Sequence, residues 1–127
     1  MRSREKEWAL AAALVALVMV VFGQVVTHGF LDYDDPGYVT RQPHVRQGLT
    51  GPGVAWAFTG VHMGNWHPLS TLSHMADVSI FGFNPRGHHL VSLLLHALNT
   101  VLLFILLRRM TGHVWPSALA AALFAVH

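Results

Sequence analysis

The sequence predicts an all-α membrane protein, because its composition is strongly apolar and it contains two apolar runs long enough to span a bilayer. Of the 127 residues, 53% are hydrophobic and 11% are charged, whereas soluble domains average about 25% charged residues. The net charge is only +2, and no cluster of basic and aromatic residues indicates a nucleic-acid partner. The lipid bilayer is the predicted partner. The sequence has no cysteine, which excludes disulfides and thiolate metal sites.

The first apolar run predicts a transmembrane helix over residues 8–28, after a short cytoplasmic N-terminus at residues 1–7. Residues 8–27 carry no charged side chain, and a helix of that length measures about 30 Å, the thickness of the hydrocarbon core. A cleaved signal peptide would have a shorter apolar core followed by a small-residue cleavage site. The sequence THGF that ends this run has no such site, so we expect the helix to be retained.

A second transmembrane helix is predicted over residues 89–107, and a third begins at residue 117. The second run, HLVSLLLHALNTVLLFILL, is again long enough to cross a bilayer. Pro116 and Ser117 are typical of a helix start. From there to residue 127, a helix would measure only about 16 Å, too short to cross. We therefore expect residues 117–127 to be a truncated helix and the sequence to be the front part of a larger protein.

The distribution of basic residues predicts a cytoplasmic N-terminus. Five of the eight Lys and Arg residues flank the two spanning runs on what would be one side: Arg2, Arg4, Lys6, Arg108 and Arg109. Short cytoplasmic segments of membrane proteins are enriched in such residues, so residues 108–116 are expected to form a cytoplasmic loop. Residues 29–88 then form an external, periplasmic loop of a multi-pass protein in the inner (plasma) membrane.

The external loop is expected to contain short helices, because long loops without structure are uncommon. One candidate helix begins at Thr50, with Pro52 in its first turn. Another begins at Pro68, where apolar residues recur at helical spacing. This second helix would lie along the membrane surface or pack against the rest of the protein.

The first candidate site is the acid pair Asp34 and Asp35, just beyond the first apolar run in the stretch FLDYDDPGYV. If two adjacent carboxylates share a desolvated pocket, the pKa of one is raised. Such a group can act as a general base toward an acceptor hydroxyl, and the pair can hold a divalent cation. The alternative interpretation is a solvated acidic turn before Pro36.

A polar stripe crosses the second apolar run. Ser92, His96 and Asn99 follow His89 at intervals of three and four residues, which places all four on one helical face. Intramembrane polar residues usually face a bundle interior or a wet cavity. We interpret the stripe as interhelical hydrogen bonding rather than as a ligand site. Haem ligation by His96 would need a second His from another helix or subunit.

Two further polar groups lie in or beside the external loop. His74 and Asp77 are three residues apart on a predicted helix, so they could share a metal ion or a hydrogen bond. Hydrogen bonding is the favoured interpretation. Basic side chains near the membrane surface could bind a substrate phosphate, because guanidinium groups match phosphate geometry; the candidates are Arg41, Arg46, Arg86, His88 and His89.

Three motifs carry a resemblance to a known family: YDDPGYV, NWHPLSTLSHMAD and FGFNPRGHHLVSLLLHALN. From about Phe30 onward the sequence resembles the N-terminal portion of bacterial membrane proteins with tetratricopeptide repeats. Those proteins are similar to the eukaryotic transmembrane-and-tetratricopeptide-repeat O-mannosyltransferases, which belong to the C-type glycosyltransferase superfamily. The resemblance implies a polytopic helical bundle of that superfamily.

The resemblance also implies a function. The protein would move a sugar, with mannose as the expected one, from a polyprenyl-phosphate donor to a Ser or Thr hydroxyl of an acceptor protein. By position in the motif, Asp34 and Asp35 would be the catalytic acids, with Asp34 preferred as the base because related mannosyltransferases place Asp first in an Asp-Glu pair. The lipid-linked sugar is a substrate, no other cofactor is certain, and a divalent cation is possible. The fragment alone is expected to be inactive.

A non-enzymatic alternative remains open at this point. The protein would then be a membrane scaffold or assembly protein whose external loop docks a partner. This interpretation predicts that replacing both acids by Asn leaves the function intact.

Overall fold

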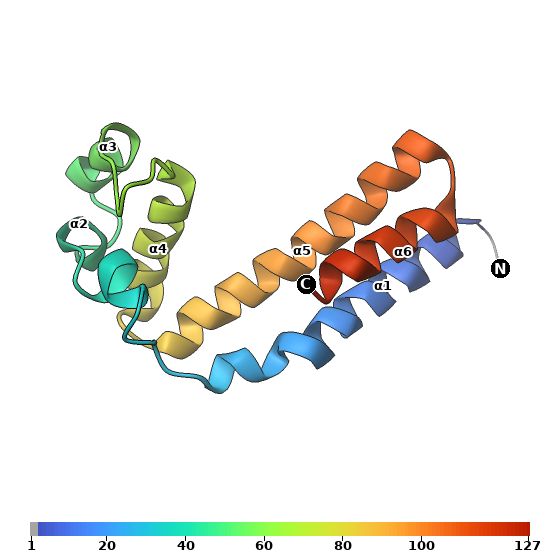
Figure 1. Ribbon diagram of the computed structural model, residues 1–127, viewed down its shortest axis with the longest axis horizontal. Coiled ribbons are helices and arrows are strands. Elements are labelled where there is room, and N and C mark those ends of the chain that lie inside the picture. Colours follow the sequence, from blue (N-terminus) through green and yellow to red (C-terminus); the bar gives the residue numbers. More distant parts are fainter. Residues whose placement is uncertain (1–2) are drawn as a thin grey trace. The chain divides into compact units, whose positions relative to one another are not determined.

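The computed structural model describes residues 3–127, and over this range the chain forms helices and no strand (Figure 1). The helices are α1 Ser3–Phe22, α2 Pro43–Arg46, α3 Gly51–Thr59, α4 Pro68–Phe81, α5 Pro85–Thr111 and α6 Val114–Ala125. A 3₁₀ segment, η1 Gly23–Thr27, continues α1, and a short π-helical segment, η2 Pro36–Thr40, precedes α2. The predicted all-α fold is confirmed.

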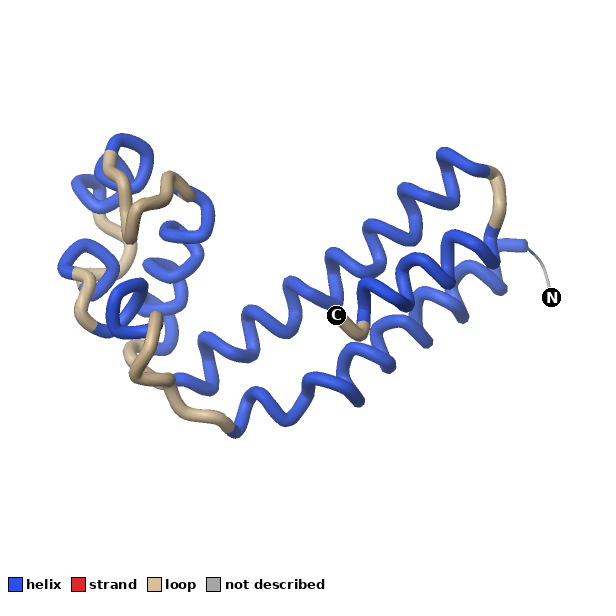
Figure 2. The backbone as a smooth tube through the Cα atoms, viewed as in Figure 1, coloured by secondary structure: helices blue, strands red, loops and turns tan. Residues whose placement is uncertain are grey.

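The chain divides into two compact units, which are described separately. The long-helix unit comprises the described part of residues 1–25 together with Leu90–His127, and the loop unit comprises Val26–His89. Figure 2 shows that the loop unit consists of short helices joined by irregular segments. In the long-helix unit, by contrast, only Gly112 and His113 separate α5 from α6.

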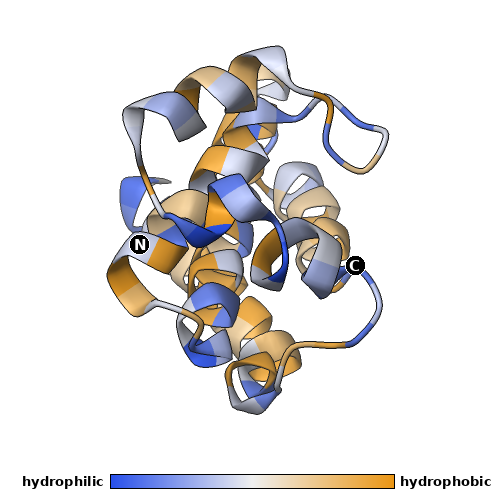
Figure 3. Cartoon of the chain, turned by 90° about the vertical axis from the view of Figure 1, so that its left-hand side faces the viewer, coloured by the Kyte–Doolittle hydropathy of each residue, from blue (hydrophilic) through white to orange (hydrophobic). Residues whose placement is uncertain are grey.

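Two helical segments of the described chain are long and apolar enough to cross a membrane, Arg4–Thr27 and Pro85–Thr111. Figure 3, which colours the chain by hydropathy, shows hydrophobic residues on several of its helices. The two segments include the runs that the sequence predicts to span. Length and composition therefore support the predicted membrane bundle.

Small residues form much of the interior of the long-helix unit. A buried cluster joins Leu14 of α1 and Phe104 of α5 to Ala118 and Ala121 of α6. Such small side chains allow helices to approach closely, and α6 packs along α1 in this way. Larger apolar side chains of the same helices point outward and are exposed: Leu94, Leu98, Leu102, Leu119 and Leu123.

The limits of α5 and α6 differ from the expected boundaries. Arg108 and Arg109 lie in the last turns of α5, so the loop expected at residues 108–116 is reduced to a tight turn. Arginine has a good helix propensity, whereas Gly112, at φ +76°, is the typical helix terminator. The expected cap Ser117 lies one turn inside α6, where it is buried and its hydroxyl donates to the His113 carbonyl at 2.6 Å.

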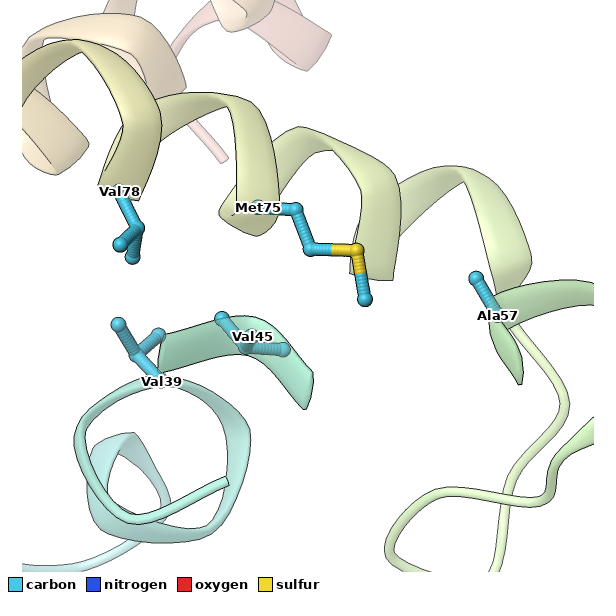
Figure 4. Close-up of a cluster of buried hydrophobic side chains, with 5 residues drawn as sticks. All are labelled: Val39, Val45, Ala57, Met75 and Val78. Carbon is cyan, nitrogen blue, oxygen red and sulfur yellow. The ribbon is translucent and has the colours of Figure 1, made fainter. Parts of the chain in front are cut away.

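The loop unit has its own hydrophobic core. Figure 4 shows that its buried side chains come from η2, α2, α3 and α4; they are Val39, Val45, Ala57, Met75 and Val78. Helix α3 begins after Thr50, whose hydroxyl accepts a hydrogen bond from the Gly53 amide at 3.1 Å, and α4 begins at Pro68. Both helices therefore start where the capping and proline signals predict. This core fixes the elements that carry the candidate site.

Candidate functional site

The acid pair lies in the loop unit, immediately before η2. Asp34 is exposed, and its carboxylate makes no hydrogen bond or ion pair with any of the described residues. Its backbone carbonyl accepts from the Tyr38 amide at 3.0 Å. Asp35 is partly buried, and its Oδ2 accepts from the Leu31 amide at 2.7 Å. The two neighbouring acids therefore differ: one carboxylate is available to solvent, and the other holds the incoming chain.

Histidine and aromatic rings surround the segment that follows the acid pair. The His62 ring packs against the rings of Tyr38, Trp56 and His67. Its Nε2 lies 2.8 Å from the Gly37 carbonyl, to which it donates. His67 Nδ1 lies 3.2 Å from the Thr71 hydroxyl of α4. These contacts attach η2, and with it the acid pair, to the start of α4.

The structure brings His88 to the pair His74 and Asp77. His74 and Asp77 lie on α4, and His88 lies in the first turns of α5. One ligand atom from each of the three residues can be chosen so that all lie within 4.8 Å of one another. His88 and Asp77 are almost completely buried, and the distance between His88 Nδ1 and Asp77 Oδ2 is 3.6 Å. We name this group the His–Asp–His cluster.

The hydrogen bond favoured for His74 and Asp77 is not found. Among the described residues, no hydrogen bond joins these two side chains, and His74 Nδ1 is buried without a hydrogen-bond partner. His88 Nδ1 is in the same condition. The structure therefore places the side chains of His74 and Asp77 near each other and near His88, without a hydrogen bond between His74 and Asp77 among the described residues.

Burial shapes the electrostatics of this cluster. It lowers the pKa of His74, because desolvation disfavours the imidazolium form, and the charge of His88 acts in the same direction. The negative charge of Asp35 opposes this change, while His62 and His67 add to it. Burial also raises the pKa of Asp77, against the opposing effect of His88.

The predicted phosphate-binding residues occupy different environments. Arg41 is exposed and pairs with exposed Asp32 at 3.8 Å, and Arg86 is exposed in the first turn of α5. Arg46 lies over the Phe83 ring and donates to the Thr40 carbonyl. His89 Nε2 lies 3.4 Å from the Gly29 carbonyl. His88, in contrast, is buried against Phe30, so its environment differs from that of the exposed arginines.

The polar stripe on α5 belongs to the long-helix unit from residue 90 onward. His96 is partly buried between the Phe22 and Phe124 rings, and its Nε2 donates to the Ala125 carbonyl of α6 at 3.1 Å. Ser92 and Asn99 are exposed in the described chain. Among the described residues, His96 makes an interhelical hydrogen bond of the kind expected for the stripe.

Sequence reasoning missed the role of His88 in the cluster and the contacts of His62 with the acidic segment. His88 is far from His74 in the sequence, and His62 is far from Tyr38. Helical periodicity therefore gives no sign that these residues meet. A weak signal existed for His88: it follows Gly82, Asn84 and Pro85, which predict a break between two helices. Such a break returns the chain toward the end of the preceding helix.

The known proteins to which the chain is similar all carry the same name, protein O-mannosyl-transferase. The chain is 33% identical over 130 residues to the protein O-mannosyl-transferase Tmtc1 of Drosophila melanogaster, covering 96% of this chain and 15% of that protein. It is 33% identical over 121 residues to Tmtc2 of the same organism, and 35% identical over 75 residues to TMTC2 of Mus musculus, both also named protein O-mannosyl-transferases. The chain thus spans about one seventh of the length of the first relative. No protein-family model and no solved structure matches the chain.

Proposed function

We propose that this chain contributes the first external loop of a membrane glycosyltransferase, since protein O-mannosyl-transferases resemble it along nearly its whole length. The proposed reaction moves mannose from a polyprenyl-phosphate donor to a Ser or Thr hydroxyl of an acceptor protein. The observation that carries the proposal is this similarity, which covers 96% of the chain. The Asp34 carboxylate, which is exposed and has no hydrogen-bond or ion-pair partner within residues 3–127, is suited to the chemistry.

In the proposed mechanism, Asp34 is the general base. It takes the proton of the acceptor hydroxyl while the hydroxyl oxygen attacks the anomeric carbon of the donor sugar. The bond from that carbon to the phosphate oxygen breaks, and its electron pair leaves with the lipid phosphate. Because attack and departure are in line on opposite faces, the configuration at the anomeric carbon inverts. An exposed carboxylate can reach an incoming hydroxyl without first breaking an internal contact.

Asp35 orients the base in this proposal. Its carboxylate holds the Leu31 amide, which fixes the chain that enters the acidic segment. Arg41 and Arg86 are exposed cations of the same unit and would neutralise the leaving phosphate. His89 also lies in this unit and would donate to it.

A labelling experiment tests the proposed location of the acid pair. The chain contains no cysteine, so Tyr33→Cys introduces one thiol, at a position that is 85% exposed. We expect a membrane-impermeant maleimide to label it in intact cells. Met110→Cys, at a position that is 72% exposed near the end of α5, is the matched control and should react only after the membrane is opened. Labelling of Met110→Cys but not of Tyr33→Cys in intact cells would overturn the proposed topology.

A sugar-transfer assay tests the function directly. It uses membranes from the cells that naturally produce the protein. Membranes containing the double variant Asp34→Asn, Asp35→Asn should transfer no radiolabelled mannose from a polyprenyl-phosphate donor to a Ser/Thr peptide. Asp32→Asn removes a neighbouring exposed acid and should retain transfer. Membrane insertion of all forms is checked by carbonate extraction. Full transfer by the double variant would contradict the catalytic proposal and favour the scaffold interpretation.

A further inference from the structure

We propose that His74, Asp77 and His88 form a binding site for a divalent transition-metal ion of the Zn²⁺ type, which joins α4 to the first turns of α5. The proposal concerns a structural site within the loop unit. It does not rest on the proposed sugar transfer, because the mechanism proposed above uses none of the three residues. Its evidence is the geometry and the hydrogen bonding of the three side chains.

The spacing of the ligand atoms fits a metal ion. Zn²⁺ binds imidazole nitrogen and carboxylate oxygen at about 2.0–2.2 Å, so two ligands on a tetrahedral ion lie about 3.4 Å apart. His88 Nδ1 and Asp77 Oδ2 are 3.6 Å apart, close to that value. With His74, the three ligand atoms lie within 4.8 Å of one another. Small rotations of the side chains would bring all three to one ion.

The hydrogen bonding of His88 selects the nitrogen that faces the cluster. Its Nε2 lies 3.0 Å from the Gly82 carbonyl, and a carbonyl can only accept, so Nε2 carries a proton. A metal-binding histidine typically donates its other ring N–H to a carbonyl or carboxylate in this way, which orients the ring. In neutral His88, Nδ1 then presents its lone pair toward Asp77.

An ion pair between protonated His88 and Asp77 is the competing explanation. An imidazolium N–H and a carboxylate normally form a hydrogen bond of about 2.7–2.9 Å. The observed 3.6 Å is too long for such a bond, and His88 Nδ1 is buried without a hydrogen-bond partner among the described residues. His74 Nδ1 is also buried and unpartnered. A cation that accepts both lone pairs and the carboxylate charge would satisfy all three groups.

The charges around the cluster favour a cation. The cluster itself contains the carboxylate of Asp77, which is almost completely buried and can offset the charge of a cation. His62 and His67 act on His74; each has one ring nitrogen bonded to a backbone or side-chain oxygen. Two imidazoles and one carboxylate suit Zn²⁺ and its neighbours in the first transition series better than Mg²⁺ or Ca²⁺, which prefer oxygen ligands.

Metal titration of the whole chain tests the proposal. The chain is purified in detergent without a histidine tag, stripped with EDTA and titrated with Zn²⁺. We expect about one equivalent to bind, and Asp77→Asn or His88→Gln to weaken binding by at least about 100-fold, because even the loss of an outer-shell contact costs 10- to 100-fold. Exposed His28 supplies the matched control His28→Gln, which should bind as the unaltered chain does.

A second measurement protects the test against variants that fail to fold. Co²⁺ added to the unaltered, stripped chain should give the intense visible absorption of a low-coordinate site, and Zn²⁺ should abolish it. Equal Zn²⁺ binding by the unaltered chain and by both ligand variants would overturn the proposal. So would the lack of a Co²⁺ band in the unaltered chain, which would leave the buried His88–Asp77 ion pair as the explanation.

Discussion

Asp34→Asn is expected to lower the rate of sugar transfer by about 100- to 10,000-fold, the usual contribution of a positioned general base. Asn has nearly the same size and exposure but cannot take a proton from the acceptor hydroxyl. Because the Asp34 carboxylate has no partner among the described residues, its replacement should leave the fold of the loop unit unchanged. The measurement is the initial rate of mannose transfer, compared with thermal unfolding of the same preparation.

Asp35→Ala is the informative comparison for this prediction, because Ala has no side-chain oxygen that can accept a hydrogen bond. Asp35 accepts a hydrogen bond from the Leu31 amide, so the loss of this bond should disturb the approach of the chain as well as the rate. We expect Asp35→Ala to lower the unfolding temperature measurably and Asp34→Asn to leave it unchanged. If Asp34→Asn retains full activity while Asp35→Ala abolishes it without loss of stability, the two roles are reversed.

Gly87→Ala is expected to destabilise the loop unit by about 1–3 kcal/mol or more, the usual cost of overpacking. Gly87 is buried at the start of α5. A Cβ atom there would overlap Phe81 Cγ and would lie 2.6 Å from Phe81 Cβ. Both atoms belong to the base of the Phe81 side chain, so a rotation of its ring cannot relieve the overlap. The last turn of α4 and the first turn of α5 would have to separate.

Gly51→Ala is the matched control for this substitution. Gly51 is the first residue of α3, and a Cβ atom there would meet nothing within 4 Å. Denaturant unfolding of both variants in detergent measures the difference, with circular dichroism reporting helix content. Equal stability of the two variants would show that the α4–α5 junction accepts the extra methyl group and is less tightly packed than described.

The helical fold followed from local signals that the sequence carries in full. Thr50 with Pro52, and Pro68 with its helical apolar spacing, predict α3 and α4, because caps and prolines act within one turn of the helix start. The ends of α5 and α6 were predicted less well. Ser117 lies inside α6, where its hydroxyl donates to the His113 carbonyl. In the sequence, a serine that makes this bond looks the same as a serine that caps a helix.

The candidate site was predictable only in part. Asp34 and Asp35 are adjacent in the sequence, so they lie close together in any fold. Their different environments, in contrast, depend on the fold and could not be predicted. The His–Asp–His cluster depends on the reversal of the chain between α4 and α5, where Gly82 adopts φ +61°. Glycine permits such a conformation, but the distance between α4 and α5 after the reversal cannot be predicted from the sequence. His88 was therefore grouped with the surface arginines.

Small side chains form much of the interior of the long-helix unit, and this reverses the usual pattern of which substitutions a protein tolerates. In a water-soluble protein, truncating a large apolar side chain is the damaging change, because it empties the core. Here Ala118, Ala121 and Ala125 are buried, so gaining a single carbon at these positions would force neighbouring helices apart. Exposed Leu98 and Leu119 could be exchanged freely among apolar residues of any size. In this unit, substitutions without effect on stability would therefore be confined to the positions of the large, exposed apolar side chains.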